Sequence, residues 1–137
     1  MSAPAAGPML GASCLCGGVR FRLPQPDGPV TACHCRQCRK TSGHYSASFD
    51  LPEAALIWDS RETLAEYATP GGATRGFCRR CGSSLWFRAA DGGFCVEAGA
   101  VEGPTGLRLA AHIWTGARGD YYRISDALPQ HEGPGDA

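Results

Sequence analysis

The chain has 137 residues, a length that suits one domain with its own hydrophobic core. Its 13 Lys and Arg residues are balanced by 13 Asp and Glu residues, and a formal charge of zero argues against a dedicated nucleic-acid-binding protein. No apolar run approaches the roughly 18 residues that a membrane-spanning helix needs.

Glycine and proline divide the chain into short pieces, because it contains 19 Gly and 10 Pro. After a flexible N-terminus over residues 1–10, we expect a single, mainly β domain over residues 11–130. Alternating, β-branched or aromatic pieces predict strands at 19–23, 45–49, 85–88, 94–97 and 107–114. Residues 53–69 lack Gly and Pro, but their apolar residues do not recur at helical spacing, so two strands are favoured. Residues 131–137 are predicted to be a flexible tail.

The cysteines indicate metal binding rather than disulfides. The N-terminus has no positive cluster followed by a long apolar run, so no signal peptide is expected and a cytoplasmic location is predicted. In a reducing compartment grouped cysteines are typical of metal or catalytic sites, and cysteines one or two residues apart are poorly placed to bridge each other. Seven of the eight cysteines fall into groups: Cys14 and Cys16, Cys33 with Cys35 and Cys38, and Cys78 with Cys81.

The first and last groups have the geometry of one closed site. Cys14 and Cys16 point to the same side of an extended segment, and Cys78 and Cys81 form a Cys-x-x-Cys turn. A glycine follows each pair and can adopt the backbone angles that the turn needs. Together the pairs supply the four sulfurs of a tetrahedral structural zinc site.

The middle group differs, because Cys33, Cys35 and Cys38 offer three thiolates without a fourth nearby. Three protein ligands and one open position are the catalytic arrangement of zinc, so two zinc ions per chain are predicted. His44 and Cys95 remain open as a fourth ligand, although Cys95 lies in an apolar run that is typical of a core thiol. An extended segment would point His34 away from the ligands on either side of it.

Basic residues flank both groups of ligands. For Arg79 and Arg80 we favour local neutralisation of the thiolates. Beside the open site, the residues Arg36, Arg39 and Lys40 could neutralise charge or capture an anionic substrate such as a peptide carboxylate.

Four motifs resemble the glutathione-dependent formaldehyde-activating enzyme family, which includes centromere protein V. They are SCLCGGVRF, ACHCRQCRKTSG, RGFCRRCGSSLWF and HIWT, within a similarity over residues 11–130. The resemblance implies an Mss4-like β-tent of short antiparallel strands stapled by zinc. It also implies that Cys14, Cys16, Cys78 and Cys81 hold a structural zinc and that Cys33, Cys35 and Cys38 hold a second, labile one. The family's reaction joins glutathione to formaldehyde, and the reverse direction makes it a carbon–sulfur lyase.

The fourth motif leaves two interpretations of His112. If this segment is extended, His112 and Trp114 share a strand face. Either Trp114 packs in the core with Tyr121 or Tyr122 and His112 is a hydrogen-bonded strand residue, or His112 reaches the pocket as a proton carrier.

Two functions follow from these patterns. The first is a zinc-dependent carbon–sulfur lyase acting on a thiol adduct, with glutathione as the small-molecule partner that the resemblance implies. The alternative is a non-catalytic zinc module that binds a protein. The fourth ligand of the middle-group metal distinguishes them, because a purely structural module has no use for an open position.

Overall fold

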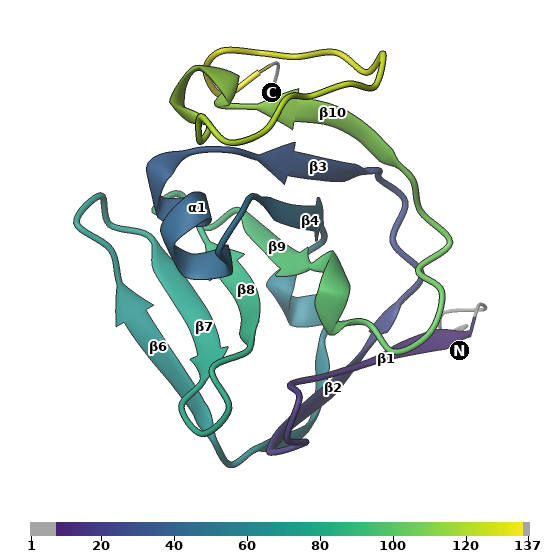
Figure 1. Ribbon diagram of the computed structural model, residues 1–137. Helices are drawn as coiled ribbons and strands as arrows, with labels where there is room; N and C mark the ends of the chain where they lie inside the picture. The colour runs from purple at the N-terminus through teal and green to yellow at the C-terminus, as the bar shows by residue number, and fades with distance from the viewer. Residues whose placement is uncertain (1–7, 136–137) are drawn as a thin grey trace.

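Two β-sheets form the framework of residues 8–135, the part of the chain that the computed structural model describes (Figure 1). The fold is mainly β, as predicted from the sequence. The strands are β1 (Met9–Ser13), β2 (Val19–Pro24), β3 (Val30–Cys33), β4 (Ser46–Asp50), β5 (Ile57–Arg61), β6 (Leu64–Ala68), β7 (Thr74–Cys78), β8 (Ser84–Arg88), β9 (Phe94–Glu97) and β10 (Leu109–Ile113). Short 3₁₀ turns lie at Glu53–Ala55, Ala98–Ala100 and Thr115–Ala117.

The small sheet has the strand order β1-β2-β5 and is antiparallel. Strand β2 alternates strictly: Val19, Phe21 and Leu23 are buried, whereas Arg20 and Arg22 are exposed. This period of two places one face of the strand in the core that the two sheets share.

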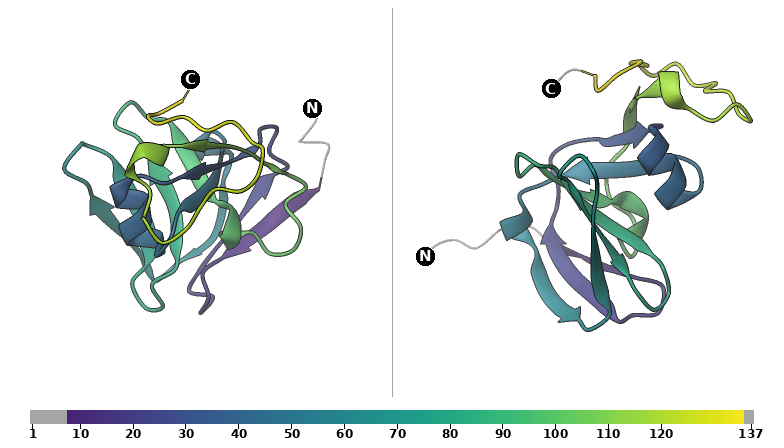
Figure 2. Two further views of the ribbon diagram at one scale, coloured as in Figure 1. Left: turned by 45° about the horizontal axis from the view of Figure 1, so that its top comes forward. Right: turned by 90° about the vertical axis from the view of Figure 1, so that its left-hand side faces the viewer.

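The large sheet has the order β10-β3-β4-β9-β8-β7-β6. All of its pairs are antiparallel except β10 with β3, which are parallel. Figure 2 shows the two sheets from two further directions, with β10 alongside β3 at the edge of the large sheet and the C-terminal segment next to β10. The parallel pair is a departure from the all-antiparallel arrangement that the sequence predicts, and it becomes possible because a long connection separates the two strands.

The five predicted strands correspond to β2, β4, β8, β9 and β10. Residues 53–69 form two strands, as predicted, but these belong to different sheets: β5 pairs with β2, and β6 pairs with β7. The sequence did not reveal β1, β3, β7 or the helix α1 (Arg36–Ser42). This helix has seven residues, and no helix within residues 8–135 has the length and apolarity needed to cross a membrane.

The sequence predicts flexible ends over residues 1–10 and 131–137. Of these, residues 1–7 and 136–137 lie outside the residues that the structure describes. Met9 and Leu10 belong to β1. Residues 131–135 lie against β10 and the turn after it: His131 N–H donates to the His112 carbonyl at 2.9 Å, and Trp114 N–H donates to the Gly133 carbonyl at 2.8 Å. The backbone contacts of the domain therefore continue past residue 130.

Gly76 in β7 lies beneath the indole of Trp86, its partner across the β7–β8 pair. A Cβ atom at Gly76 would lie 2.1 Å from Trp86 Cε2. We expect Gly76→Ala to lower the free energy of unfolding by about 1–3 kcal/mol, because the indole must leave its place in the core. Gly11→Ala, in β1 and with nothing within 4 Å of the added Cβ, is the matched control. Urea unfolding of both variants tests this, and equal stability of the two would contradict it.

Candidate metal centres

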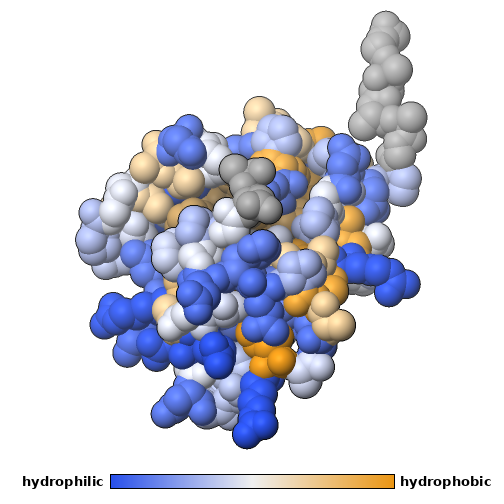
Figure 3. Space-filling view, turned by 90° about the horizontal axis from the view of Figure 1, so that it is seen from above, coloured by the Kyte–Doolittle hydropathy of each residue, from blue (hydrophilic) through white to orange (hydrophobic). Residues whose placement is uncertain are grey.

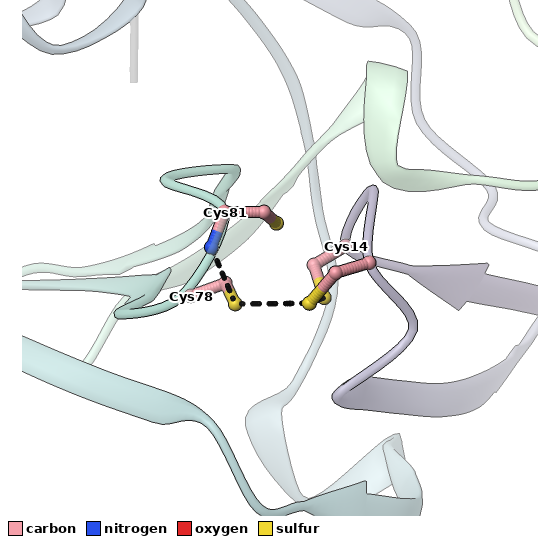
Figure 4. Close-up of side chains that lie close together, drawn as sticks. Cys14, Cys78 and Cys81 are labelled. Carbon is pink, nitrogen blue, oxygen red and sulfur yellow. Dashed lines mark hydrogen bonds between the residues drawn. The ribbon is translucent and has the colours of Figure 1, made fainter.

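Four cysteines from two distant turns meet where the two sheets approach each other. Cys14 and Cys16 follow β1 of the small sheet, while Cys78 and Cys81 lie at the end of β7 in the large sheet. Their four sulfur atoms all lie within 4.8 Å of one another, and Figure 4 shows three of them around a common point. The Cys14–Cys16 and Cys16–Cys78 sulfur distances are both 3.6 Å. Four thiolates at zinc–sulfur distances of about 2.3 Å lie about 3.8 Å apart in a tetrahedron, so the cluster fits a structural zinc ion.

The Cys78–Cys81 turn directs backbone N–H groups at sulfur. Cys78 Sγ accepts hydrogen bonds from the N–H groups of Arg80 and Cys81, each at 3.3 Å. Gly82 has φ = 83° and Gly17, after the first pair, has φ = 82°. Both are in the left-handed region that favours glycine, as the sequence indicates.

The surroundings of this cluster favour thiolates. Arg80 Nε donates to Cys16 Sγ at 3.3 Å, in agreement with the interpretation of Arg80 as a neutralising residue. Hydrogen bonds from Ser83 lower the pKa of the Cys81 thiol to about 5. Burial opposes ionisation of Cys78, but the hydrogen bonds to its sulfur outweigh burial and lower its pKa to about 7.

The second cluster contains Cys33, Cys35 and Cys38, whose sulfur atoms also lie within 4.8 Å of one another. Cys33 ends β3, and Cys35 is the N-cap of α1, with extended backbone angles of φ −66° and ψ 164°. Cys35 Sγ accepts a hydrogen bond from the Cys38 N–H at 3.3 Å. Strand and helix therefore bring the three thiols together, apart from the four-cysteine cluster, as the spacing predicts.

A cation is needed if all three of these thiols are to ionise. Hydrogen bonds from Cys33 and Cys38 lower the pKa of Cys35, whereas the pKa of Cys33 is raised, mainly by its hydrogen bond to Cys35. Ionisation of one thiol thus opposes ionisation of its neighbours by charge repulsion. A soft divalent ion such as zinc removes that repulsion, so the donor set fits a metal.

Neither candidate fourth ligand belongs to the three-cysteine cluster among the described residues. His44 is exposed, and its Nδ1 lies 2.9 Å from the Tyr121 hydroxyl. Cys95 lies on the cavity face of β9 rather than in the core, which corrects the interpretation from the sequence. Burial raises the pKa of the Cys95 thiol to about 12. Among the described residues, this cluster therefore offers three protein ligands to a metal ion.

A cavity of about 520 Å³ opens beside the three-cysteine cluster. This volume suits a small-molecule ligand. Its apolar wall includes Pro29, Phe87, Ala111, Ile113, Trp114 and Pro134, and its polar wall includes Ser46, Ser48, Asp50, Arg75 and Glu97. Figure 3, viewed from above, shows apolar and polar side chains mixed on the face that carries β10 and the C-terminal segment.

The arginine of the cavity is Arg75 of β7. Its Nη2 lies 3.6 Å from Cys38 Sγ and 3.4 Å from Gln37 Oε1. Its guanidinium carbon lies 4.9 Å from the centre of the Phe87 ring. A cation is thus held beside the thiolates and the cavity.

The basic residues that the sequence indicated lie elsewhere on α1. Arg36 and Lys40 are exposed, Arg39 is half-buried, and none of the three lines the cavity. A helix with 3.6 residues per turn directs the neighbours of Cys38 to its other faces.

Glu97 is an acidic group on the same cavity. It shares a face of β9 with Cys95, whereas Phe94 and Val96 point into the core. The Ser46 hydroxyl donates to the Glu97 carboxylate, with both oxygens at 2.8 Å. Burial raises the pKa of Glu97, which keeps a carboxyl group close to the range where it can exchange a proton.

His34 and His112 lie on the side of β3 and β10 opposite to the cavity. His34 is fully buried and points away from the ligands, as predicted, and burial together with the neighbouring His112 lowers its pKa to about 4. His112 is a hydrogen-bonded strand residue, 3.0 Å from Asp126 Oδ2, as the first interpretation expects, and the alternative place for it in the pocket is wrong. The core position expected for Trp114 is also wrong: β10 ends at Ile113, Trp114 has φ = 55°, and its side chain, 41% exposed, lines the cavity.

Comparison with known proteins identifies this arrangement. The model of the glutathione-dependent formaldehyde-activating enzyme family matches residues 9–117, a range that contains both cysteine clusters. The chain belongs to this family. The family assignment confirms the resemblance of the four motifs.

Relatives of this family member differ in how much they share with it. A Halomonas elongata protein, provisionally named as a glutathione-dependent formaldehyde-activating enzyme, is 36% identical over an alignment of 86 positions that covers 57% of the chain and only 55% of that protein. An uncharacterized lyase of Schizosaccharomyces pombe is 23% identical over 116 residues, or 83% of the chain and 84% of that protein. The crystal structure of a Rhodobacter sphaeroides protein has a TM-score of 0.58 at 22% identity, covers 73% of the chain and 99% of that protein's chain, and shows a shared fold.

In this member of the family, sequence reasoning missed Arg75, Glu97 and Asp126. The alternation of residues 94–97 carried a signal for Glu97, because it places Glu97 and Cys95 on one face. The sequence signal for Asp126 was weaker. An aspartate side chain often caps a turn by accepting a hydrogen bond from the backbone N–H two residues later, here that of Leu128. Nothing local marked Arg75, which meets Cys38 only through the pairing of distant strands.

Proposed function

We propose that the protein is a zinc-dependent carbon–sulfur lyase-type enzyme that acts on a thiol adduct such as S-hydroxymethylglutathione. The three-cysteine cluster, which opens onto a cavity of about 520 Å³, carries this proposal. Three thiolates make zinc a weak Lewis acid that is better suited to holding a sulfur ligand than to splitting water. The family assignment and the lyase name of one relative support the reaction class. The reduced cysteines suit a reducing compartment such as the cytoplasm.

The residues of the cavity suit the chemistry of a hemithioacetal. Bound by Cys33, Cys35 and Cys38, zinc would supply a position for the substrate sulfur and would stabilise the glutathione thiolate that is left when the carbon–sulfur bond breaks. In the lyase direction the hydroxyl group of the adduct loses its proton, the carbonyl of formaldehyde forms, and the electron pair of the carbon–sulfur bond passes to sulfur. Glu97, oriented by Ser46, can accept that proton, and in the reverse direction its acid form returns a proton.

Charged groups around the cavity suit a peptide-like thiol. Arg75 can meet a substrate carboxylate, and Asp50, which also lines the cavity, can meet an ammonium group. Arg36, Arg39 and Lys40 lie outside the cavity, and we keep them as candidate contacts for parts of the substrate that extend beyond it. Holding the substrate sulfur and the charged groups of the substrate at the same time keeps the reacting groups together. A bimolecular encounter then becomes a reaction within one complex.

The alternative is a non-catalytic zinc module that binds a protein. A fourth protein ligand would favour it, and neither His44 nor Cys95 occupies that position among residues 8–135. The polar wall of the cavity, with a buried carboxylate and an arginine beside the thiols, favours the enzyme.

Protein loaded with cobalt in both clusters tests the open position. We expect added glutathione to change the thiolate-to-cobalt absorption in a saturable way, because the thiol enters the free position as a thiolate. Cys38→Ser should abolish the change. Cys95→Ser, which removes a cysteine outside the cluster, should preserve it. No spectral change in wild-type protein that carries two cobalt ions would refute the lyase and favour the binding module.

A further inference from the structure

A chain of hydrogen bonds joins four side chains on the face of β3 and β10 away from the cavity. The Tyr122 hydroxyl contacts His34 Nδ1. His34 Nε2 lies 2.9 Å from His112 Nδ1, and His112 Nε2 lies 3.0 Å from Asp126 Oδ2. The two histidines are 0% and 3% exposed, so water does not supply these contacts. None of the four residues belongs to either metal cluster.

The carboxylate of Asp126, at one end of this chain of hydrogen bonds, decides which atom donates and which accepts in each of them. The carboxylate of Asp126 only accepts, so His112 Nε2 carries a proton and donates it. In a neutral ring His112 Nδ1 then accepts from His34 Nε2, and His34 Nδ1 accepts from the hydroxyl of Tyr122. Every ring nitrogen is satisfied, and Asp126 sets the direction of the whole chain.

The chain of hydrogen bonds passes through the segment that carries two metal ligands. His34 stands between Cys33 and Cys35, and its backbone N–H donates to the carbonyl of Ile113 at 3.0 Å. Successive side chains of an extended segment point to opposite sides, so holding His34 on the far side turns Cys33 and Cys35 toward the cavity. Both the backbone and the side chain of His34 are thereby tied to β10.

Asp126 also holds the C-terminal segment on β10. Its Oδ1 accepts from the Leu128 N–H at 3.0 Å, and the following carbonyl, that of Pro129, accepts from the His112 N–H at 2.9 Å. Residues further along this segment, His131 and Pro134, line the cavity. One carboxylate thus links the ligand segment to part of the cavity wall.

We propose that Asp126, His112, His34 and Tyr122 are positioning residues that set the metal affinity of the three-cysteine cluster. Outer residues that orient ligands typically change metal affinity by about 10–100-fold when they are removed. Within residues 8–135, the four-cysteine cluster is not joined to these four residues in this way. Its metal affinity should therefore not depend on the chain of hydrogen bonds. The inference rests on the proposed function, because it requires a metal ion at Cys33, Cys35 and Cys38.

The test compares the two zinc ions within one molecule. Asp126 has a half-exposed side chain, so Asp126→Ala should fold. We expect it to weaken zinc binding at the three-cysteine cluster by about 10-fold or more, with unchanged binding at the four-cysteine cluster. Asp126→Asn keeps an acceptor oxygen and should recover most of the affinity. Asp120→Ala, at an exposed aspartate of the same segment, is the matched control and should resemble wild type.

Zinc transfer to a chromophoric chelator, followed at equilibrium, measures both affinities. His112→Asn is a second variant, with the same expected selective loss. Equal affinities in wild type, Asp126→Ala and His112→Asn would overturn the inference, and so would an equal loss at both clusters. Wild-type protein that binds only one zinc would overturn the proposed function and the inference with it. Two zinc ions with unchanged affinity in the variants would overturn the inference alone.

Discussion

Cys81→Ser is expected to yield unfolded or insoluble protein. Cys14 and Cys16 leave the small sheet and Cys78 and Cys81 end a strand of the large sheet, so this cluster ties the two sheets together. Structural zinc sites contribute about 10–16 kcal/mol, which equals or exceeds the about 5–15 kcal/mol by which domains are usually stable. Loss of one ligand should therefore remove most of the stability of the fold.

Cys38→Ser is the matched variant in the other cluster. Cys33, Cys35 and Cys38 lie within a segment of six residues, so their metal closes no long loop. We expect Cys38→Ser to fold, to bind one zinc instead of two, and to unfold near the temperature of wild type. Circular dichroism and elemental analysis of both variants measure these properties. Collapse of both variants alike would contradict the division between a structural and a functional site.

Glu97→Gln should lower the rate of S-hydroxymethylglutathione cleavage by about 10²–10⁴-fold, the usual contribution of a positioned acid or base. Glutamine keeps the size and can accept from Ser46, but it cannot take a proton. Because burial raises the pKa of Glu97, its base form is lost as pH falls through that raised pKa. Wild-type activity in the lyase direction should therefore decline at a higher pH than an exposed carboxylate would dictate.

Glu66→Gln is the control for this prediction. Glu66 is exposed on the edge strand β6, and its only ion pair within residues 8–135 is a 4.0 Å surface contact with Arg88, which should contribute little. Its rate and pH profile should match those of wild type. Equal rates in Glu97→Gln and wild type, at two zinc ions per chain, would remove Glu97 from the mechanism. A wild-type rate no higher than the uncatalysed rate would contradict the lyase itself.

The separation of the cysteines into two clusters could be predicted because the decisive geometry is local. Cys33 and Cys35 lie two residues apart in an extended segment, and Cys78 and Cys81 flank a turn followed by Gly82, so each pair points its sulfurs together wherever it lies in the fold. The same local alternation predicted that His34 faces away from the ligands. Strand β2 was predictable for the same reason, since its period of two is uninterrupted.

Local spacing did not predict the direction of a side chain where a single backbone angle or a turn of helix changed that direction. Alternation placed His112 and Trp114 on one face, but φ = 55° at Trp114 turns its ring to the cavity while His112 stays on the other side. Proximity in sequence marked Arg36, Arg39 and Lys40 as candidate cations beside the second cluster, but the cation that lines the cavity is Arg75 of a distant strand.

The sequence by itself predicted the local groups of cysteines and the mainly β character of the chain, because these depend on spacings of two or three residues and on composition. The joining of the first and last groups was expected because two pairs complete a tetrahedral site, but the fold brings them together across the 62 positions between Cys16 and Cys78. Only the tertiary structure decided what surrounds the second cluster. Arg75 reaches Cys38 across 37 positions, Ser46 reaches Glu97 across 51, and His34 reaches His112 across 78. Such contacts depend on strand order and register, which arise from burial of the whole core and leave no local pattern in the residues that make them.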